Sequence, residues 1–185
     1  INILTHSINQ GKGAALLTGF EAAAKVADWA ITVDADGQHD LGDVPRLVNA
    51  LTDAKRPIVI GLRQGMDGKA VPWTSRFGRG FSNFWVLLSG GSRIQDSQCG
   101  FRIYPLPETL KLKTKAKRYQ FEVEVLAKAS WKGIPVIEVP VSVDYMPGEG
   151  RVSHFRPFID FLRNSSTFTR LITQRILIPS YFRKK

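Results

Sequence analysis

Two carboxylates follow a short apolar segment in the first part of the chain. Residues 29–33 are mostly apolar, and residues 34–38 read Asp-Ala-Asp-Gly-Gln. In an extended backbone, residues two apart point to the same side, so Asp34 and Asp36 can direct both carboxylates one way. Such a pair offers hard oxygen ligands, which suit Mg2+ or Mn2+ shared with the phosphates of a substrate. A capped turn is the competing interpretation, because Asp and Gly are common where strands end.

The elements that must position these carboxylates follow from the apolar pattern. Short apolar runs alternate with helical patterns, which predicts an α/β architecture with a mostly parallel sheet. We expect strands at residues 2–5, 30–33, 57–62, 99–104 and 136–145. We expect helices at residues 12–27, 44–52, 73–88 and 120–131.

The end of the chain predicts a further helix at residues 154–178, with Ser153 as a candidate N-cap and Pro179 ending it. Arginines and other polar residues recur along one side of this helix, whereas phenylalanines and aliphatic residues fall largely elsewhere. The pattern is typical of an interfacial membrane helix, although an amphipathic helix docked on the sheet has the same pattern. We expect a catalytic domain at residues 1–150 and a basic amphipathic segment on a membrane surface at residues 151–185.

The composition fits one domain with a sizeable core. The 185 residues are 43% hydrophobic and contain no apolar run long enough to span a bilayer and no signal-peptide pattern. The single cysteine, Cys99, excludes an internal disulfide framework and fits a reducing compartment. These features predict a cytoplasmic location.

The positive charge is concentrated at the end of the chain. Of the net charge of +10, residues 151–185 hold eight basic residues against the single acid Asp160, which leaves +3 for residues 1–150. The charge therefore says more about the partner of this last segment than about the domain before it. Anionic lipid and nucleic acid are the two candidate partners.

Four motifs in order resemble those of family 2 glycosyltransferases, and among these the polyprenyl-phosphate sugar synthases of the dolichyl-phosphate mannose synthase type. Residues 9–15 read Asn-Gln-Gly-Lys-Gly-Ala-Ala, 34–40 read Asp-Ala-Asp-Gly-Gln-His-Asp, 61–63 read Gly-Leu-Arg, and 96–102 read Asp-Ser-Gln-Cys-Gly-Phe-Arg. Residues 121–124, 138–141 and 153–155 also resemble late segments of the family, so the resemblance covers nearly the whole chain.

The resemblance implies a GT-A fold that binds a GDP- or UDP-hexose through Mg2+ or Mn2+. By position in the motif, Asp36 and Gln38 would hold the metal, and Asp34 would lie near the ribose or the base. The relatives also have an N-terminal strand with a Pro-x-Tyr-Asn segment, which this sequence lacks, so we expect a catalytic domain that is truncated at its N-terminus.

Catalytic roles are expected for Arg63, Arg102 and Asp96. Cleavage of the sugar to phosphate bond leaves a nucleoside diphosphate, whose growing negative charge a cation and arginines must neutralise. Arg63 and Arg102 are candidates for that role or for the phosphate of the acceptor. Asp96 matches a position that serves relatives as a base or orients the acceptor. A lipid phosphate is already ionised near neutral pH and needs no strong base, whereas a sugar hydroxyl would need one.

Further contacts to phosphate are expected from basic and glycine residues. Lys12 and Gly13 open the first helix, where free N–H groups and a lysine can meet a phosphate, although ordinary helix-start chemistry explains them as well. Arg151 resembles a family position that reaches phosphate at the mouth of the site facing the membrane. His39 and His154 lack metal-ligand spacing and are left out of the metal site.

The leading hypothesis is an enzyme that moves a hexose, with inversion, from a nucleotide sugar to a polyprenyl phosphate on the cytoplasmic face of a membrane. One alternative is the same donor chemistry with a saccharide or a glycerolipid as acceptor. Another is a nucleic-acid-binding module that depends on residues 151–185, the basic tail of the chain. Because the phenylalanines of the tail lie in a helix without a stacking platform on strands, we expect no nucleic-acid partner.

Overall fold

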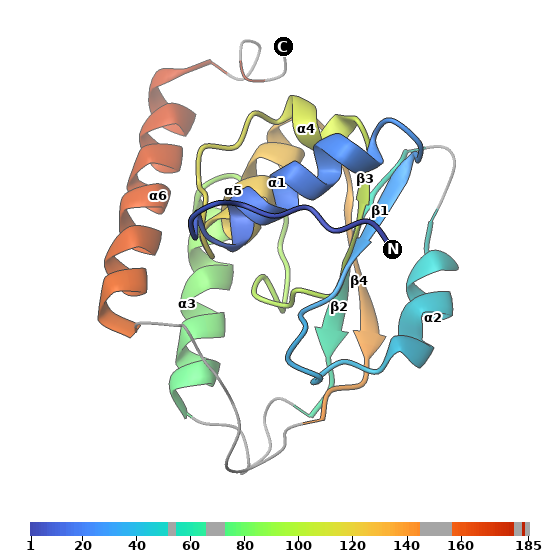
Figure 1. The fold of residues 1–185 in the computed structure, drawn as a ribbon. Coiled ribbons are helices and arrows are strands. Elements are labelled where there is room, and N and C mark those ends of the chain that lie inside the picture. The colour runs from blue at the N-terminus through green and yellow to red at the C-terminus, as the bar shows by residue number, and fades with distance from the viewer. Residues whose placement is uncertain (52–54, 66–72, 145–156, 180–182, 184–185) are drawn as a thin grey trace.

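The computed structural model describes residues 1–51, 55–65, 73–144, 157–179 and 183 (Figure 1). Its centre is a four-stranded sheet in the order β1-β3-β2-β4. The strands are β1 (Trp29–Thr32), β2 (Ile58–Arg63), β3 (Arg102–Pro105) and β4 (Val136–Val141). β3 pairs antiparallel with both β1 and β2, and β2 pairs parallel with β4.

The expected α/β class is confirmed, but the expectation of a mostly parallel sheet is wrong for the strand pairs. β1, β2 and β4 run in the same direction, yet the reversed β3 lies between β1 and β2, so only β2 and β4 form a parallel pair. The cause is the segment 89–101, which follows a helix and returns to the edge where β2 ends before β3 begins (Figure 1). A hydrophobic pattern identifies a strand without giving its direction.

Helices cover the sheet on both faces. α1 (Lys12–Ala23), α3 (Trp73–Leu88) and α5 (Phe121–Trp131) lie on one side, and α2 (Val44–Val48) lies on the other (Figure 1). The short helices η1 (Leu41–Asp43) and α4 (Glu108–Lys111) were not expected from the sequence. α6 (Pro157–Leu177) lies outside α3 and α5.

Most expected elements form within a few residues of their expected limits, but the strand expected at residues 2–5 does not. Residues 1–6 have no regular secondary structure, and Ile3 and Leu4 are exposed. A strand is stabilised by hydrogen bonds to a neighbour, and no strand among the described residues pairs with this segment. The expected strand at residues 99–104 begins only at Arg102, because the preceding residues form a loop.

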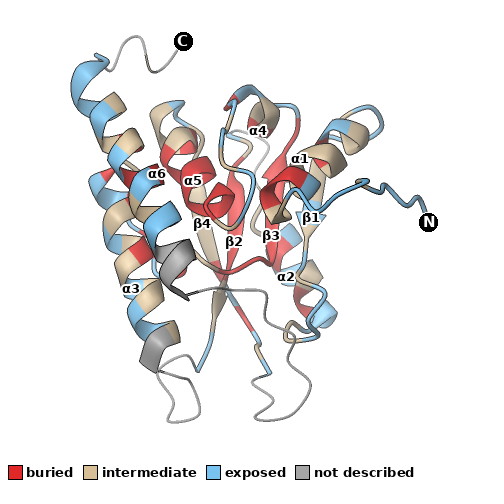
Figure 2. Cartoon of the chain, turned by 60° about the vertical axis from the view of Figure 1, so that its left-hand side comes forward, coloured by how far each residue is buried: buried red, intermediate tan, exposed pale blue. Residues whose placement is uncertain are grey.

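The core lies between the sheet and the helices α1, α3 and α5 (Figure 2). α6 extends this core, since Phe168 and Leu171 are fully buried and the ring of Phe168 lies 6.1 Å from that of Trp85. Arg170 of α6 also forms an ion pair of 2.9 Å with the buried Glu124 of α5. The expected apolar residues of this helix are thus divided: some dock on the core, whereas Leu162 and Ile176 face outward. No helix in the described ranges is long and apolar enough to cross a bilayer.

Candidate active site

The chemically important residues meet at one edge of the sheet. β1, β2 and β4 all end at this edge, which lies at the bottom of Figure 1. Asp34 follows β1, Arg63 is the last residue of β2, and residues 142–144 follow β4. The loop 95–101 leads into β3 at the same edge. In open α/β sheets the crevice at the carboxyl ends of the strands is the usual place for a ligand.

Lys12 joins two carboxylates at the base of this site. Its ammonium lies 2.6 Å from Asp34 Oδ1 and 2.6 Å from Glu122 Oε1. Burial lowers the pKa of Lys12, but the charges of Glu122 and Asp34 raise it by more, so the net direction is upward. Lys12 is therefore a permanent cation that fixes the carboxylate of Asp34.

The carboxylate of Asp34 also contacts the loop before β3. A β-carbon at Gly100 would lie 2.6 Å from Asp34 Cγ, so only glycine fits there without a shift. Thr32 Oγ1 donates a hydrogen bond of 2.9 Å to the carbonyl of Gly100. The second and the last of the four sequence motifs, residues 34–40 and 96–102, are thus in direct contact.

Asp36 and Gln38 lie on the exposed turn after β1. The backbone N–H of Gln38 donates to Asp36 Oδ1 at 3.2 Å, and its carbonyl accepts from the N–H of Asp144 at 2.9 Å. An open pocket beside the turn is lined by residues 37–40 and 142–144. Asp34 is already paired with Lys12, whereas Asp36 forms no ion pair with a described residue.

This donor set fits a divalent metal ion that a substrate helps to bind. A carboxylate and an amide supply hard oxygens, and Mg2+ is commonly held by one or two protein ligands together with phosphates and water. No group of three or more His, Cys, Asp and Glu residues close enough to hold a metal occurs in the part of the chain that the structure describes. A metal on Asp36 and Gln38 would therefore have open positions for a diphosphate.

Arg63 and Asp96 form a two-pronged ion pair. Arg63 Nε lies 2.7 Å from Asp96 Oδ2, and Arg63 Nη2 lies 2.8 Å from Oδ1. Asp96 is completely buried, and the side chain of Arg63 keeps 13% of its surface exposed. Both oxygens of Asp96 therefore accept hydrogen bonds from one guanidinium, a geometry that fixes the arginine.

Neighbouring side chains hold the loop that carries Asp96. Glu138 Oε1 accepts from the N–H groups of Gln95 and Asp96, each at 2.8 Å. Asn83 of α3 accepts from the N–H of Ser97 at 2.9 Å and donates to the carbonyl of Gln95 at 2.6 Å. The loop is thus bound through its backbone by β4 and α3.

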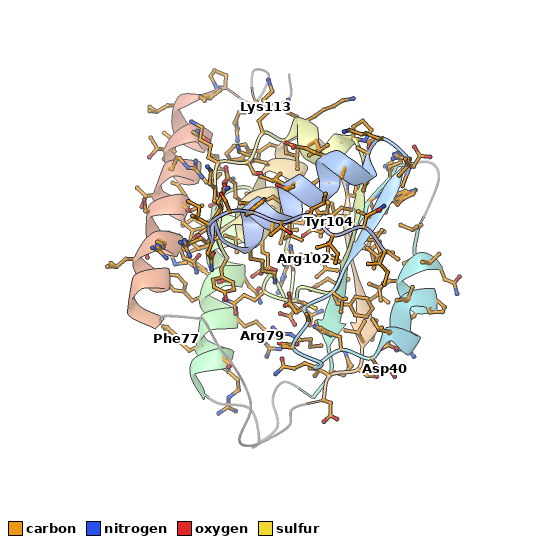
Figure 3. The ribbon with its side chains drawn as sticks, viewed as in Figure 1. Asp40, Phe77, Arg79, Arg102, Tyr104 and Lys113 are labelled. Carbon is orange, nitrogen blue, oxygen red and sulfur yellow. The ribbon has the colours of Figure 1, made fainter. Side chains whose placement is uncertain are left out.

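Arg102 lies inside the protein and not at the open edge of the site. It is fully buried and near the centre of the molecule in Figure 3. Its guanidinium donates to the carbonyls of Cys99, Ser97 and Glu122 and to the hydroxyl of Tyr104. This placement argues against the expectation that Arg102 meets a phosphate, because its donors already bind the backbone that leads into and supports the site.

The segment before α5 packs closely against the start of α1. A β-carbon at Gly13 would lie 2.6 Å from Phe121 Cβ and 2.9 Å from the carbonyl oxygen of Arg118, and the N–H of Ala14 donates to the carbonyl of Lys117. Gly13 therefore allows close packing between α1 and the segment before α5, which argues against its expected contact with phosphate. Arg151, the other expected phosphate contact, lies outside the described residues.

His39 and Cys99 lie beside the ion pairs. His39 Nε2 lies 3.9 Å from Cys99 Sγ, and the buried Nδ1 of His39 has no hydrogen-bond partner among the described residues. Burial and the charge of Arg63 lower the pKa of His39. Burial raises the pKa of the Cys99 thiol to about 12, so the thiol stays protonated and is not a nucleophile.

The structure brings Lys12, Asp34, Arg63 and Asp96 to one edge, as the sequence motifs indicated. Glu122 and Glu138 hold these residues in place. We assigned no role to either glutamate from the sequence, although both lie within short apolar segments. A carboxylate in an apolar segment is a signal for a buried partner, because a buried charge is costly without one.

Comparisons with known proteins agree with this arrangement. Residues 1–110 match the family described as Glycosyl transferase family 2. The chain is 31% identical over 147 residues to a UDP-N-acetylglucosamine–dolichyl-phosphate N-acetylglucosaminyltransferase of Methanococcus voltae. This match covers 77% of this chain and 59% of that protein. It is 29% identical over 161 residues to an undecaprenyl-phosphate mannosyltransferase of Micrococcus luteus, and the match covers 83% of this chain and 65% of that protein. The chain thus spans about three fifths of the length of these relatives.

A solved structure supports the fold. Glucosyl-3-phosphoglycerate synthase from Mycobacterium tuberculosis, in complex with Mn2+, UDP-glucose and phosphoglyceric acid, superposes with a TM-score of 0.59. The identity is 22%, and the match covers 94% of this chain and 57% of that one. The likeness confirms the GT-A fold, and by its match over residues 1–110 the chain belongs to glycosyl transferase family 2.

Proposed function

We propose that the protein transfers a hexose, with inversion, from a nucleoside diphosphate sugar to a polyprenyl phosphate, using Mg2+ or Mn2+ at a membrane surface. The observation that supports this proposal most directly is the burial of Asp96 and its pairing with Arg63. This residue is fully buried, and both of its oxygens accept hydrogen bonds from Arg63. A carboxylate in this position is poorly placed to remove a proton from an acceptor.

A phosphate acceptor needs no such proton transfer. Its oxygen is ionised near neutral pH and can attack the anomeric carbon directly as the bond to the leaving diphosphate breaks. Arg63, which Asp96 holds in place, is suited to bind the phosphate of the acceptor through its guanidinium. The names of the relatives, which act on dolichyl and undecaprenyl phosphate, support the same acceptor class.

The donor end of the site would contain Asp34, Asp36 and Gln38. Asp36 and Gln38 would hold the divalent ion, which when bound neutralises charge on the leaving diphosphate. Asp34, fixed by Lys12 and Gly100, would face the nucleoside. The Mn2+ and UDP-glucose in the complex of the M. tuberculosis enzyme support a metal-dependent nucleotide donor.

The membrane surface would contact α3 and α6. The two helices lie side by side in both ribbon views (Figures 1 and 2). Phe77, Phe84 and Leu88 recur along one stripe of α3 and are 61%, 58% and 41% exposed. The sequence of α3 contains two arginines and no acidic residue. An apolar stripe on a helix that carries basic and no acidic residues is suited to an anionic lipid surface, so residues 151–185 and α3 would together hold the catalytic domain on the membrane.

The test is transfer of radiolabelled hexose from GDP- and UDP-sugars into lipid by the full-length protein, with Mg2+ or Mn2+ added. We expect an organic-extractable product that releases hexose in mild acid, no product after chelation, and a loss of at least about a hundredfold with Asp36→Ala. Glu21→Ala, an exposed change on α1, is the control. Transfer that Asp36→Ala leaves intact would contradict the proposal, and a water-soluble product would favour a saccharide acceptor.

A further inference from the structure

The loop that carries Asp96 is held from two sides by residues of opposite charge. Glu138 of β4 accepts from the backbone N–H groups of residues 95 and 96, each at 2.8 Å. Arg102 of β3 donates to the backbone carbonyls of residues 97 and 99. The anion therefore binds the donors of the loop, and the cation binds its acceptors.

The register of the sheet sets the distance between these two residues. Ile60 of β2 pairs with Arg102 on one side and with Glu138 on the other. Residues that pair across neighbouring strands point to the same face of the sheet. Arg102 and Glu138 thus stand in one row, two strand spacings or about 10 Å apart. A rigid sheet, not the loop itself, fixes where the loop is held.

We propose that Glu138 and Arg102 are positioning residues for Asp96 and, through Asp96, for the guanidinium of Arg63. This inference rests on the proposed function, in which Arg63 binds the phosphate of the acceptor. Asp96 is buried in the loop that Glu138 and Arg102 bind, and its carboxylate accepts hydrogen bonds from both Nε and Nη2 of Arg63. A shift of the loop therefore moves the guanidinium at the end of β2.

Glu138 gives the clearest test because two related variants separate its roles. Glu138→Gln keeps an acceptor oxygen for the two N–H groups, whereas Glu138→Ala removes it. A displacement of about 1 Å at a reacting group can reduce the rate by a hundredfold. We expect Glu138→Ala to raise the KM for polyprenyl phosphate about tenfold and to leave the KM for the nucleotide sugar within twofold. Glu138→Gln should recover most of the loss.

A measurement without substrate tests the same inference by a second route. Hydrogen exchange of the Arg63 Nε–H with solvent, followed by 15N NMR and assigned with Arg63→Lys, reports how firmly Asp96 holds the guanidinium. We expect exchange about tenfold faster in Glu138→Ala and near the wild-type rate in Glu138→Gln. Arg102→Lys, which keeps the charge but cannot reach as many carbonyls, should also speed the exchange. If Glu138→Ala does not fold, Glu138→Asp, shorter by one methylene, takes its place.

Glu124 provides a matched control. It accepts from the N–H groups of residues 115 and 116, at 3.1 and 2.8 Å, just as Glu138 does from residues 95 and 96. That segment follows Lys113, which lies at the opposite end of the molecule from Asp40 (Figure 3). Glu124→Gln should reduce stability without changing the KM for the acceptor or the exchange at Arg63.

Two results would separate the inference from the proposed function. If Glu138→Ala folds and leaves both the exchange at Arg63 and the acceptor KM within twofold of wild type, the positioning role is wrong. If the wild-type protein transfers no hexose to any lipid phosphate, the proposed function is wrong, while the exchange of Arg63 still decides the positioning role.

Discussion

Gly100 lies directly against the carboxylate of Asp34. A β-carbon at residue 100 would approach Asp34 Cγ to 2.6 Å and Oδ1 to 2.7 Å and would collide with Oδ2. The hydrogen bond from Thr32 Oγ1 holds the carbonyl of Gly100 beside β1. The orientation of the Asp34 carboxylate thus depends on the absence of a side chain at residue 100.

Gly100→Ala is expected to displace Asp34 and weaken its contact with Lys12. Overpacking at such a contact reduces the free energy of unfolding by about 1–3 kcal/mol. Transfer activity should fall at least about tenfold because the change displaces Asp34, which we propose faces the nucleoside of the donor. Urea unfolding and the KM for the nucleotide sugar are the measurements. Gly19→Ala in α1, where a β-carbon meets nothing within 4 Å, is the control. That change should stabilise the protein by about 0.5–1 kcal/mol, and equal activity in the two variants would contradict the prediction.

Lys12→Met is expected to reduce the free energy of unfolding by about 3 kcal/mol at pH 7, because Glu122, only 7% exposed, would lose its cation. The charges of Glu122 and Asp34 outweigh the effect of burial and raise the pKa of Lys12 above its ordinary value of 10.5. A group with a raised pKa in the folded state stabilises the protein below its unfolded pKa and stops doing so as the pH rises further.

The difference between wild type and Lys12→Met should therefore stay constant from pH 7 to about pH 10 and shrink above it. Urea unfolding at several pH values measures this difference. Lys25→Met removes an exposed lysine just after α1 and should change stability by less than about 0.5 kcal/mol. A difference that grows with pH would show that Lys12 does not supply the stabilising charge.

The sequence predicted the elements whose apolar pattern is local. α3 begins and ends where its pattern indicates, and β2, whose first four residues include the buried Ile58, Val59 and Ile60, forms within one residue of its expected limits. It could not predict the direction of β3, since the direction depends on the path of residues 89–101. The strand expected at residues 2–5 has a suitable pattern but no neighbour among the described strands.

The same dependence on tertiary structure explains which features of the site could be predicted from the sequence. The motifs placed Asp34, Arg63 and Asp96 in a common region because each follows, ends or precedes a strand at one edge. Spacing along the chain could not show that Arg102 points inward, because that depends on the reversed strand that carries it. Nor could it pair Lys12 with Glu122, since tertiary packing of α1 on α5 brings the two together.

Glu124→Gln is expected to reduce stability at neutral pH by about 3 kcal/mol, because this fully buried carboxylate pairs with Lys128 and Arg170. Burial raises the pKa of Glu124, but the hydrogen bond and charge of Lys128 and the N–H groups of Ala116 and Lys115 lower it by more. A depressed pKa means that the contribution is present above the unfolded pKa, about 4.3, and is lost as the pH falls below it.

Urea unfolding at pH 7 and at decreasing pH measures this effect. The difference between wild type and Glu124→Gln should be constant above about pH 5 and should narrow in acid. Glu21→Gln, an exposed change on α1, should show no such dependence. A difference that persists unchanged at pH 3 would assign the loss to packing and not to the charge of Glu124.

Phe168→Ala is expected to detach α6 from the core. Phe168 is 1% exposed, and its ring lies 6.1 Å from that of Trp85 and 6.3 Å from that of Phe81. Removal of a buried phenylalanine reduces the free energy of unfolding by about 3–5 kcal/mol. Ile176→Ala, on the same helix but 74% exposed, should cost less than about 0.5 kcal/mol. Equal losses in the two variants would show that α6 is not docked through Phe168.

Replacing both Phe77 and Phe84 by serine is expected to reduce binding to anionic vesicles about tenfold, because each exposed ring would otherwise be buried in the lipid surface. Sedimentation with phosphatidylglycerol-containing vesicles measures the bound fraction, and neutral vesicles test the part played by charge. The free energy of unfolding should change little, since both residues are more than half exposed. Val26→Ser, an exposed apolar residue after α1, is the matched control. If the control weakens binding as much as the double variant does, the stripe on α3 is not the membrane contact, and the basic tail alone would have to explain the binding.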